Sequence, residues 1–252
     1  MRLDELGERR IIDEILRPRY GIPASTYFGD DCARVVEASS IGGGTVVATT
    51  DPCPEPMATV LGFSDPYYRG WLLATINLSD LAAAGARPLG LLTSLILPNE
   101  TTTDELVRLL DGIDDCCASN ETRVIGGNLK EGLKIDVSAT AIGFCAMGNC
   151  LSRTGCLDGD AIVVVGDFGL FWAGVLAVQH KLLTGSNEHD LLRNILTPMP
   201  KVRVGWQIAL NHLLTACLDN SDGLYASLAQ LAASNQRYSN DAISGMVLMV
   251  RR

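Results

Sequence analysis

Apolar side chains recur along this chain in two alternating patterns, short uninterrupted runs and helical spacings. Residues 5–16 carry apolar side chains on one helical face, and Pro18 ends that pattern. Residues 45–50 include several β-branched side chains and predict a short strand. Residues 68–84, which are rich in Leu and Ala, predict a long helix that Gly85 closes.

Strands and helices continue to alternate up to residue 145. We expect strands over residues 89–97 and 133–145. A helix is expected over residues 104–118, with Thr103 as its N-cap and acidic residues in its first turn, where the helix dipole favours them. Residues 123–125 are apolar or extended and lead into a pair of glycines.

Gly, Asn, Ser and Asp collect between residues 146 and 159, which indicates a domain boundary. We therefore divide the chain into a first domain over residues 1–150 and a second over residues 151–252. The second domain contains predicted strands over residues 161–165 and 216–218 and predicted helices over residues 170–183, 202–215 and 224–233.

The regular pattern dissolves beyond Ser234 into polar residues, and only residues 246–250 are apolar. Too little patterned sequence follows the last predicted helix to complete an α+β layer. We therefore expect the second domain to be incomplete. Residues 237–241 are predicted to be mobile, and residues 246–250 to pack as a stray strand or to mispair.

The charge balance narrows the possible partners. The chain has 252 residues, a formal net charge of −9 and 47% hydrophobic residues, which suits a globular protein with a sizeable core. A net negative charge argues against binding nucleic acid or an anionic membrane through a broad basic face. It leaves an anionic nucleotide possible, because bound Mg²⁺ inverts the local field.

The remaining composition indicates a cytoplasmic protein with reduced thiols. Residues 1–19 are charged throughout and lack the apolar segment of a secretory signal. The eight cysteines form no CxxC pair, and the three histidines do not lie near them with zinc-site spacing. We therefore expect buried free thiols and no zinc.

Short acidic signatures recur where apolar runs end. They are Gly29-Asp30-Asp31, Thr49-Thr50-Asp51, Asn77-Leu78-Ser79-Asp80, Gly126-Gly127-Asn128 and Asp219-Asn220-Ser221-Asp222-Gly223. Mg²⁺ prefers hard oxygen ligands and usually keeps some of its water, so a few carboxylates from separate loops are enough to hold it together with phosphates. These segments would have to fold together to form one polyphosphate and metal site.

Each signature also has a structural interpretation. An Asp after Gly is often only a turn residue, and Arg153 could be a surface ion-pair partner. Asp80 is the most informative position, because it lies within an otherwise apolar helix. A carboxylate there is costly unless a cation or hydrogen-bond donors meet it.

The order and spacing of these segments resemble the thiamine-monophosphate kinase family, within the superfamily that includes aminoimidazole ribonucleotide synthetase. The segments that carry the resemblance are residues 29–33, Thr50-Asp51, residues 77–86, Ser152-Arg153-Thr154-Gly155 with Gly159-Asp160, and Ser221-Asp222-Gly223-Leu224. The resemblance implies an α/β domain with a mixed sheet that pairs across a homodimer, followed by an α+β domain. It also implies that ATP and several Mg²⁺ ions lie in clefts at the dimer.

The resemblance further implies roles for individual residues. The metal ligands would be Asp31, Thr49, Thr50, Asp51, Asp80, Asp219 and Asp222, with Asp30 a weaker candidate. Arg153 and Ser221 would contact ATP, and Gly127 and Asn128 would belong to its phosphate loop. Asp51, Asp80 and Arg153 would support catalysis. Since the acceptor phosphate is already anionic near pH 7, no strong general base is required.

Three departures from the family pattern bear on the identity of the substrate. Asn128 stands where the family has Asp, Ala58 falls near the family's substrate-contacting His, and the family's Gly-Gly-Glu-Asp-Tyr-Glu segment is absent. The implied function is ATP- and Mg²⁺-dependent phosphorylation of thiamine monophosphate to thiamine diphosphate. The alternatives are an ATP-dependent amide-activating synthetase of the same superfamily and an inactive paralogue that binds nucleotide.

Overall fold

The computed structural model describes residues 32–36, 43–157, 159–166, 169–183, 185, 188–235 and 247–249. The helix expected over residues 5–16 lies outside the described residues, as do Asp30, Asp31 and residues 237–241.

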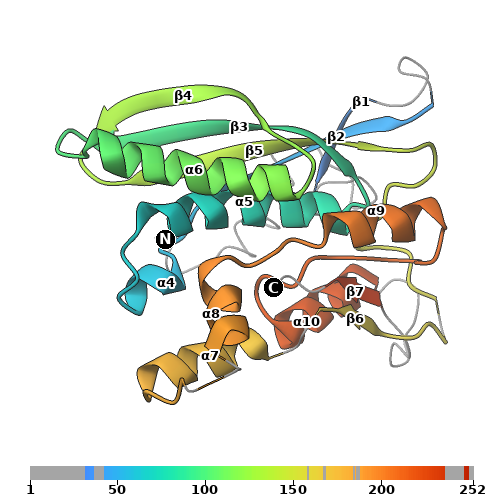
Figure 1. The fold of residues 1–252 in the computed structure, drawn as a ribbon. Coiled ribbons are helices and arrows are strands. Elements are labelled where there is room, and N and C mark those ends of the chain that lie inside the picture. The colour runs from blue at the N-terminus through green and yellow to red at the C-terminus, as the bar shows by residue number, and fades with distance from the viewer. Residues whose placement is uncertain are drawn as a thin grey trace, which may run out of the picture.

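A mixed sheet of five strands forms the upper layer of the molecule (Figure 1). Its strands follow the order β1 (Ala33–Val36), β2 (Thr45–Pro52), β5 (Asp136–Cys145), β3 (Arg87–Pro98) and β4 (Val124–Gly132). All neighbours are antiparallel except β3 and β4, which run parallel. The crossover that a parallel pair requires is supplied by a helix.

Two helices, α5 (Pro66–Ala83) and α6 (Thr103–Ser119), cover one face of this sheet (Figure 1). Side chains of β5 alternate between buried and half-buried, as expected for a strand with only one covered face. Leu73, Leu78, Leu81 and Leu91 are fully buried between the sheet and the helices. Each such side chain stabilises the fold by about 1.5–3 kcal/mol.

The two covering helices approach each other closely at two glycines. A Cβ atom at Gly70 of α5 would overlap the carbonyl oxygen of Leu109, and one at Gly112 of α6 would overlap that of Tyr67. Each helix therefore presents a glycine to the backbone of the other. A larger residue at either position would force the helices apart.

The N-termini of these helices are capped by side chains. In α6 the cap is Thr102 rather than the predicted Thr103: Glu105 N donates to Thr102 Oγ1 (3.2 Å), and Thr102 N donates to Glu105 Oε2 (2.8 Å). This reciprocal pair requires Glu three residues after the cap, a spacing that Thr103 does not have. In α5, Asp65 Oδ1 accepts a hydrogen bond from Tyr67 N (3.0 Å), and Pro66 starts the helix.

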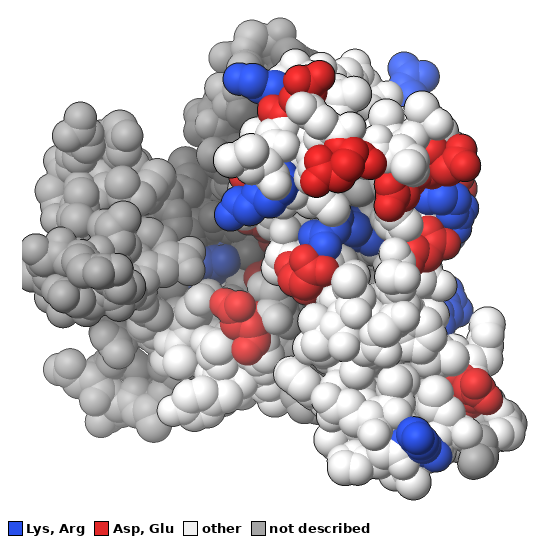
Figure 2. Space-filling model, turned by 90° about the vertical axis from the view of Figure 1, so that its left-hand side faces the viewer, with Lys and Arg blue, Asp and Glu red and all other residues white. Residues whose placement is uncertain are grey.

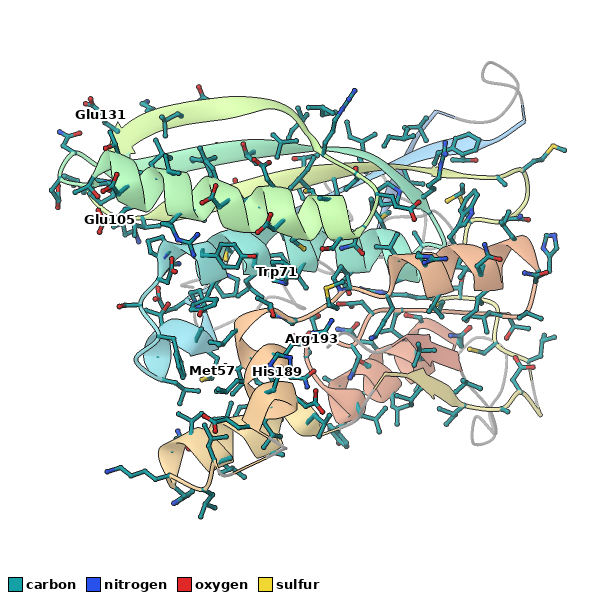
Figure 3. All side chains as sticks on the ribbon, in the orientation of Figure 1. Met57, Trp71, Glu105, Glu131, His189 and Arg193 are labelled. Carbon is teal, nitrogen blue, oxygen red and sulfur yellow. The ribbon has the colours of Figure 1, made fainter. Side chains whose placement is uncertain are left out.

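The second half of the chain lies below the helix layer (Figure 1). It contains β6 (Val163–Val165), α7 (Leu170–Gln179), α8 (Glu188–Leu196), α9 (Val202–Leu210), α10 (Leu224–Asn235) and β7 (Val247–Met249). Helix α9 packs directly on α5, because a Cβ at Gly205 would overlap the carbonyl oxygen of Ala82. Trp71 Nε1 also donates to Pro198 O (2.8 Å), and Figure 3 shows Trp71 between α5 and this lower part.

Several predicted elements differ in extent. The helix expected over residues 202–215 ends at Leu210, because His212 adopts a positive φ of 49° that an α-helix does not continue. Residues 216–218 are buried but form no strand. Helix α8 was not predicted, and α4 (Met57–Val60) adds one turn after the proline-rich stretch. Residues 246–250 were expected to form a stray strand or to mispair, whereas Val247–Met249 form β7, which pairs in parallel with β6.

Sheet residues that point away from the helices include several exposed apolar side chains. They are Leu89, Leu92 and Ile125, each 37–47% exposed. On the face shown in Figure 2, acidic and basic side chains are interspersed over the upper part and sparse over the lower part. Among the helices of the described ranges, none combines the length and apolarity needed to cross a membrane.

All eight cysteines carry free thiols, as expected. Burial raises the pKa of Cys53, Cys116 and Cys117 to about 12, so these thiols stay protonated near neutral pH. They are core residues.

Candidate functional site

The end of β2 and the last turns of α5 form the first part of the candidate site. Thr49 Oγ1 donates to Asp80 Oδ2 (2.8 Å), and Asp51 N donates to Asn77 Oδ1 (3.1 Å). Asp80 is only 8% exposed, so its carboxylate is held with a hydroxyl donor beside it. The structure thus brings together three predicted metal residues, Thr49, Asp51 and Asp80, from segments far apart in sequence.

Asn77 connects these two segments. It is fully buried, and its Nδ2 donates to Leu73 O one turn earlier in the same helix (3.0 Å). Its Oδ1 is thereby oriented toward the backbone N–H of Asp51. Both polar groups of the amide have partners, which is how a buried Asn is tolerated inside a helix. Asn77 was part of a recognised segment, but no role had been predicted for it.

Thr50 points the other way. Its Oγ1 donates to Ala139 O (2.9 Å) and accepts from Thr140 Oγ1 (3.0 Å) on the neighbouring strand β5. Successive strand residues point to opposite faces of a sheet, so the side chain of Thr50 cannot share the face on which Thr49 meets Asp80. The structure does not bring the Thr50 hydroxyl to this part of the site.

The acidic turn at Asp219–Gly223 forms a second part. Asp219 and Asn220 are 7% and 8% exposed, whereas Ser221 and Asp222 are exposed. Ser221 N donates to Asp219 Oδ2 (3.2 Å), an Asx-type turn. Gly223 has a φ of 90°, a left-handed conformation that costs little only for glycine, and helix α10 begins at the next residue.

The segment around Arg153 runs beside this turn. Cys217 N donates to Ser152 O (2.8 Å). The residue before Arg153 is therefore bonded to the buried residues 216–218, which lead into Asp219. Further along, Thr215 Oγ1 and Leu157 N both donate to Asp160 Oδ2, and these bonds lower the pKa of Asp160. The predicted ATP residue Arg153 and the predicted metal ligand Asp219 therefore lie on neighbouring segments.

Gly127 and Asn128 lie on an edge strand rather than in a loop. They belong to β4, where Gly127 pairs with Thr93 and Asn128 with Ser94 of β3. A Cβ at Gly127 would overlap the Thr93 carbonyl oxygen, so glycine permits the close pairing. The expectation of a loop at this position is wrong, because both residues belong to a strand. Any contact with a nucleotide would therefore come from the edge of the sheet.

The carboxylates are not assembled into one cluster within the described part of the chain. Over those residues, no group of three or more His, Cys, Asp or Glu side chains could hold a metal ion. Asp31 lies outside that part. One cavity of about 290 Å³ is lined by Arg87, Asn120, Arg203 and Trp206 together with other residues, none of them a predicted site residue.

The oxygen atoms that the structure brings together are nevertheless suitable ligands for Mg²⁺. They are carboxylate and hydroxyl oxygens, which are the ligands that Mg²⁺ prefers over nitrogen or sulfur. Asp80 and Asp219 are both largely buried, and such carboxylates are favourable where a cation or donors compensate their charge.

The chain is similar to several known proteins. A family model described as AIR synthase related protein, N-terminal domain, matches residues 29–145. Thiamine-monophosphate kinase of Methanospirillum hungatei is 30% identical over 224 residues, which are 88% of this chain and 70% of that protein. The Aquifex aeolicus enzyme is 30% identical over 92% of this chain and 72% of its own length.

Solved structures give the same result. A structure described as AaThiL complexed with AMPPCP and TMP superimposes with a TM-score of 0.77 at 29% identity, covering 93% of this chain and 72% of that one. Thiamine-monophosphate kinase from Stenotrophomonas maltophilia K279a gives a TM-score of 0.67 at 27% identity, covering 89% and 71%.

The mixed sheet with helices on one face lies within residues 29–145, which match the AIR synthase-related domain, so this part of the chain has that class of α/β fold. Within that class, the chain belongs to the thiamine-monophosphate kinase family.

Proposed function

We propose that this protein transfers the γ-phosphoryl group of ATP to thiamine monophosphate, which yields thiamine diphosphate and ADP. The observation that carries the proposal is the similarity over 93% of the chain to a structure complexed with AMPPCP and TMP. The relatives that cover most of the chain bear the name of this kinase.

The mechanism requires positioning and charge neutralisation rather than proton abstraction. A phosphate oxygen of the acceptor attacks the γ-phosphorus in line, the bond from the γ-phosphorus to the bridging oxygen breaks, and ADP leaves. Bound Mg²⁺ would supply the positive charge that neutralises the phosphate oxygens. Asp51, Asp80 and Asp219 would hold it, with Thr49 orienting Asp80.

Arg153 and Ser221 would bind the nucleotide. A guanidinium offers two parallel donors to phosphate oxygens, and it stays charged at every physiological pH. Ser221 is exposed next to the buried Asp219, so a phosphate held by its hydroxyl would lie near the metal ligands. Asp31, Thr50 and Asp222 remain predicted ligands, and Gly127 and Asn128 remain predicted nucleotide contacts from the edge of β4.

We further propose that the protein acts in the cytoplasm as a homodimer. The exposed apolar residues of the sheet face opposite the helices support this, because a second copy placed on that face would bury them. If two copies pair through the same face about a two-fold axis, each copy covers the apolar residues of the other.

The test is a turnover assay with purified protein, ATP, Mg²⁺ and thiamine monophosphate, read by chromatographic detection of thiamine diphosphate. Thiamine diphosphate should form only when all components are present, and EDTA should stop it. Binding of an ATP analogue without product would point to another acceptor, such as the amide of a synthetase substrate. No nucleotide binding by the folded protein would overturn the proposal.

A further inference from the structure

Helix α10 is bonded at both ends to segments of the candidate site. In its first turn, Ser227 Oγ bonds with the backbone carbonyl oxygen of Asp219 (3.3 Å) and with Asn220 Oδ1 (2.9 Å). At its last residue, Asn235 binds the segment that contains Arg153. One helix thus connects the predicted metal turn to the predicted nucleotide arginine.

The amide of Asn235 uses its whole hydrogen-bonding capacity. Its Oδ1 accepts from Gly155 N (2.9 Å) and Cys156 N (3.1 Å). Its Nδ2 donates to Arg153 O (2.8 Å) and to Leu231 O one turn back in α10 (2.8 Å). With two acceptor and two donor bonds and only 2% exposure, this side chain is a fixed point between α10 and the Arg153 segment.

The rest of the Arg153 segment has little freedom to compensate for a change at Asn235. Gly155 has a φ of 121°, and a Cβ there would meet the Thr215 carbonyl oxygen, so the chain passes close to its neighbour. On the other side of Arg153, Ser152 O accepts from Cys217 N. The backbone of Arg153 is therefore held from both sides, and three of those holding bonds come from Asn235.

We propose that Asn235 is a positioning residue that fixes the backbone of Arg153 relative to the acidic turn at Asp219–Asp222, with α10 as the rigid connection. The inference rests on the proposed function, in which Arg153 contacts ATP beside the metal ligands. An Asn side chain that donates to the backbone carbonyl four residues earlier is common in helices. The bonds to Gly155, Cys156 and Arg153 join Asn235 to another segment and do not stabilise α10 itself.

The experiment compares Asn235→Leu and Asn235→Ser with Asn194→Leu as the matched control. Asn194 is 7% exposed, and its Nδ2 donates to Asp190 O one turn back in α8, so its replacement removes the same kind of helix bond without touching the Arg153 segment. For each variant, KM for MgATP, kcat and the melting temperature are measured. We expect the Asn235 variants to raise KM for MgATP about tenfold, as displaced supporting residues do, while the control leaves it within about twofold of the original.

A double substitution separates positioning from a general loss of structure. In an Arg153→Ala background, Asn235→Leu should raise KM for MgATP no further, because the residue through which it acts is gone. An equal rise with and without Arg153 would overturn the inference. So would Asn235 variants that behave like the Asn194 control, or that fail to fold while the control folds.

The result for the unsubstituted protein distinguishes the two proposals. If it binds no MgATP, the proposed function fails and this inference fails with it. If it turns over and the Asn235 variants match the control, only the inference is wrong.

Discussion

Thr49 Oγ1 lies 2.8 Å from Asp80 Oδ2, and this bond joins the end of β2 to the last turns of α5. Asp80 is only 8% exposed, and this hydroxyl supplies one of the donors that a buried carboxylate requires. The bond therefore fits a metal ligand with a supporting residue better than a carboxylate placed only for solubility.

Asp80→Asn should weaken binding of MgATP by at least about tenfold, equivalent to about 1.4 kcal/mol, because the substitution removes a charge from the metal site. The fold should be affected less, since Asn is nearly isosteric and can still accept from Thr49. Calorimetric titration with a non-hydrolysable ATP analogue and thermal unfolding measure the two effects. Asp51→Asn should behave in the same way. Unchanged affinity with a large fall in melting temperature would assign Asp80 a structural role.

Thr49→Val should reduce affinity for Mg²⁺ in the presence of nucleotide by about tenfold, because it removes the donor that orients Asp80 while keeping the side-chain shape. Thr75→Val is the matched control, since that hydroxyl is buried in α5 and donates to Pro198 O rather than to a site residue. A Mg²⁺ titration of activity compares the two variants. Equal losses would show that the Thr49 hydroxyl has no special function.

Leu92→Lys should convert the proposed dimer to a monomer, because it places a charge on the exposed apolar sheet face, where Leu92 is 37% exposed. Val107→Lys is the control, at a position on α6 that is 53% exposed and faces away from the sheet. Light scattering at micromolar concentration gives the mass of each variant. A monomeric unsubstituted protein would contradict the dimer.

Asp65 and Arg108 should contribute to stability in a pH-dependent way. The hydrogen bond from Arg108 holds the pKa of Asp65 below its ordinary value of 3.8. A lowered folded-state pKa contributes stability that is present above the unfolded-state pKa and is lost as pH falls through the folded-state pKa.

Asp65→Asn keeps a helix cap that accepts from Tyr67 N but removes the charge that meets Arg108. The difference in unfolding free energy between the two proteins should therefore be present at pH 7, begin to decline near pH 3.8, and be lost as pH falls through the lower folded-state pKa. Urea unfolding across this pH range measures it. A difference that does not vary with pH would mean that the ion pair contributes nothing.

The elements with strong periodicity could be predicted from the sequence. Residues 68–84 and 104–118 were expected as helices, and α5 and α6 occupy nearly those positions because their apolar faces cover the sheet. Helix α8 was missed, although Leu191, Leu192 and Ile195 have helical spacing. It is short and rich in charge, so its stability comes from packing on α7 rather than from its own sequence.

Local sequence could not show that β4 is a strand. Gly126, Gly127 and Asn128 are all disfavoured in strands, and only pairing with β3 makes the extended conformation favourable there.

The candidate site, like the fold, could be predicted from the sequence only in part. Asp80 could be recognised because a carboxylate in an apolar helix needs a partner. Its partner Thr49 was predicted only through a family resemblance. Asn235 gave no signal at all, because each of its bonds to the Arg153 segment joins residues about 80 positions apart. Long-range hydrogen bonds of this kind become visible only in three dimensions.

The glycine pair of α5 and α6 has a consequence for how the site tolerates change. Gly112 touches no site residue, yet it determines how near α6 can approach the helix that carries Asn77 and Asp80. An alanine at Gly112 would push on the backbone of α5 at Tyr67 and so tilt the far end of the same rigid rod. The added methyl group on α6 would thus displace the carboxylate of Asp80, several turns away along α5. Activity would then fall after a substitution that adds no charge and removes no ligand.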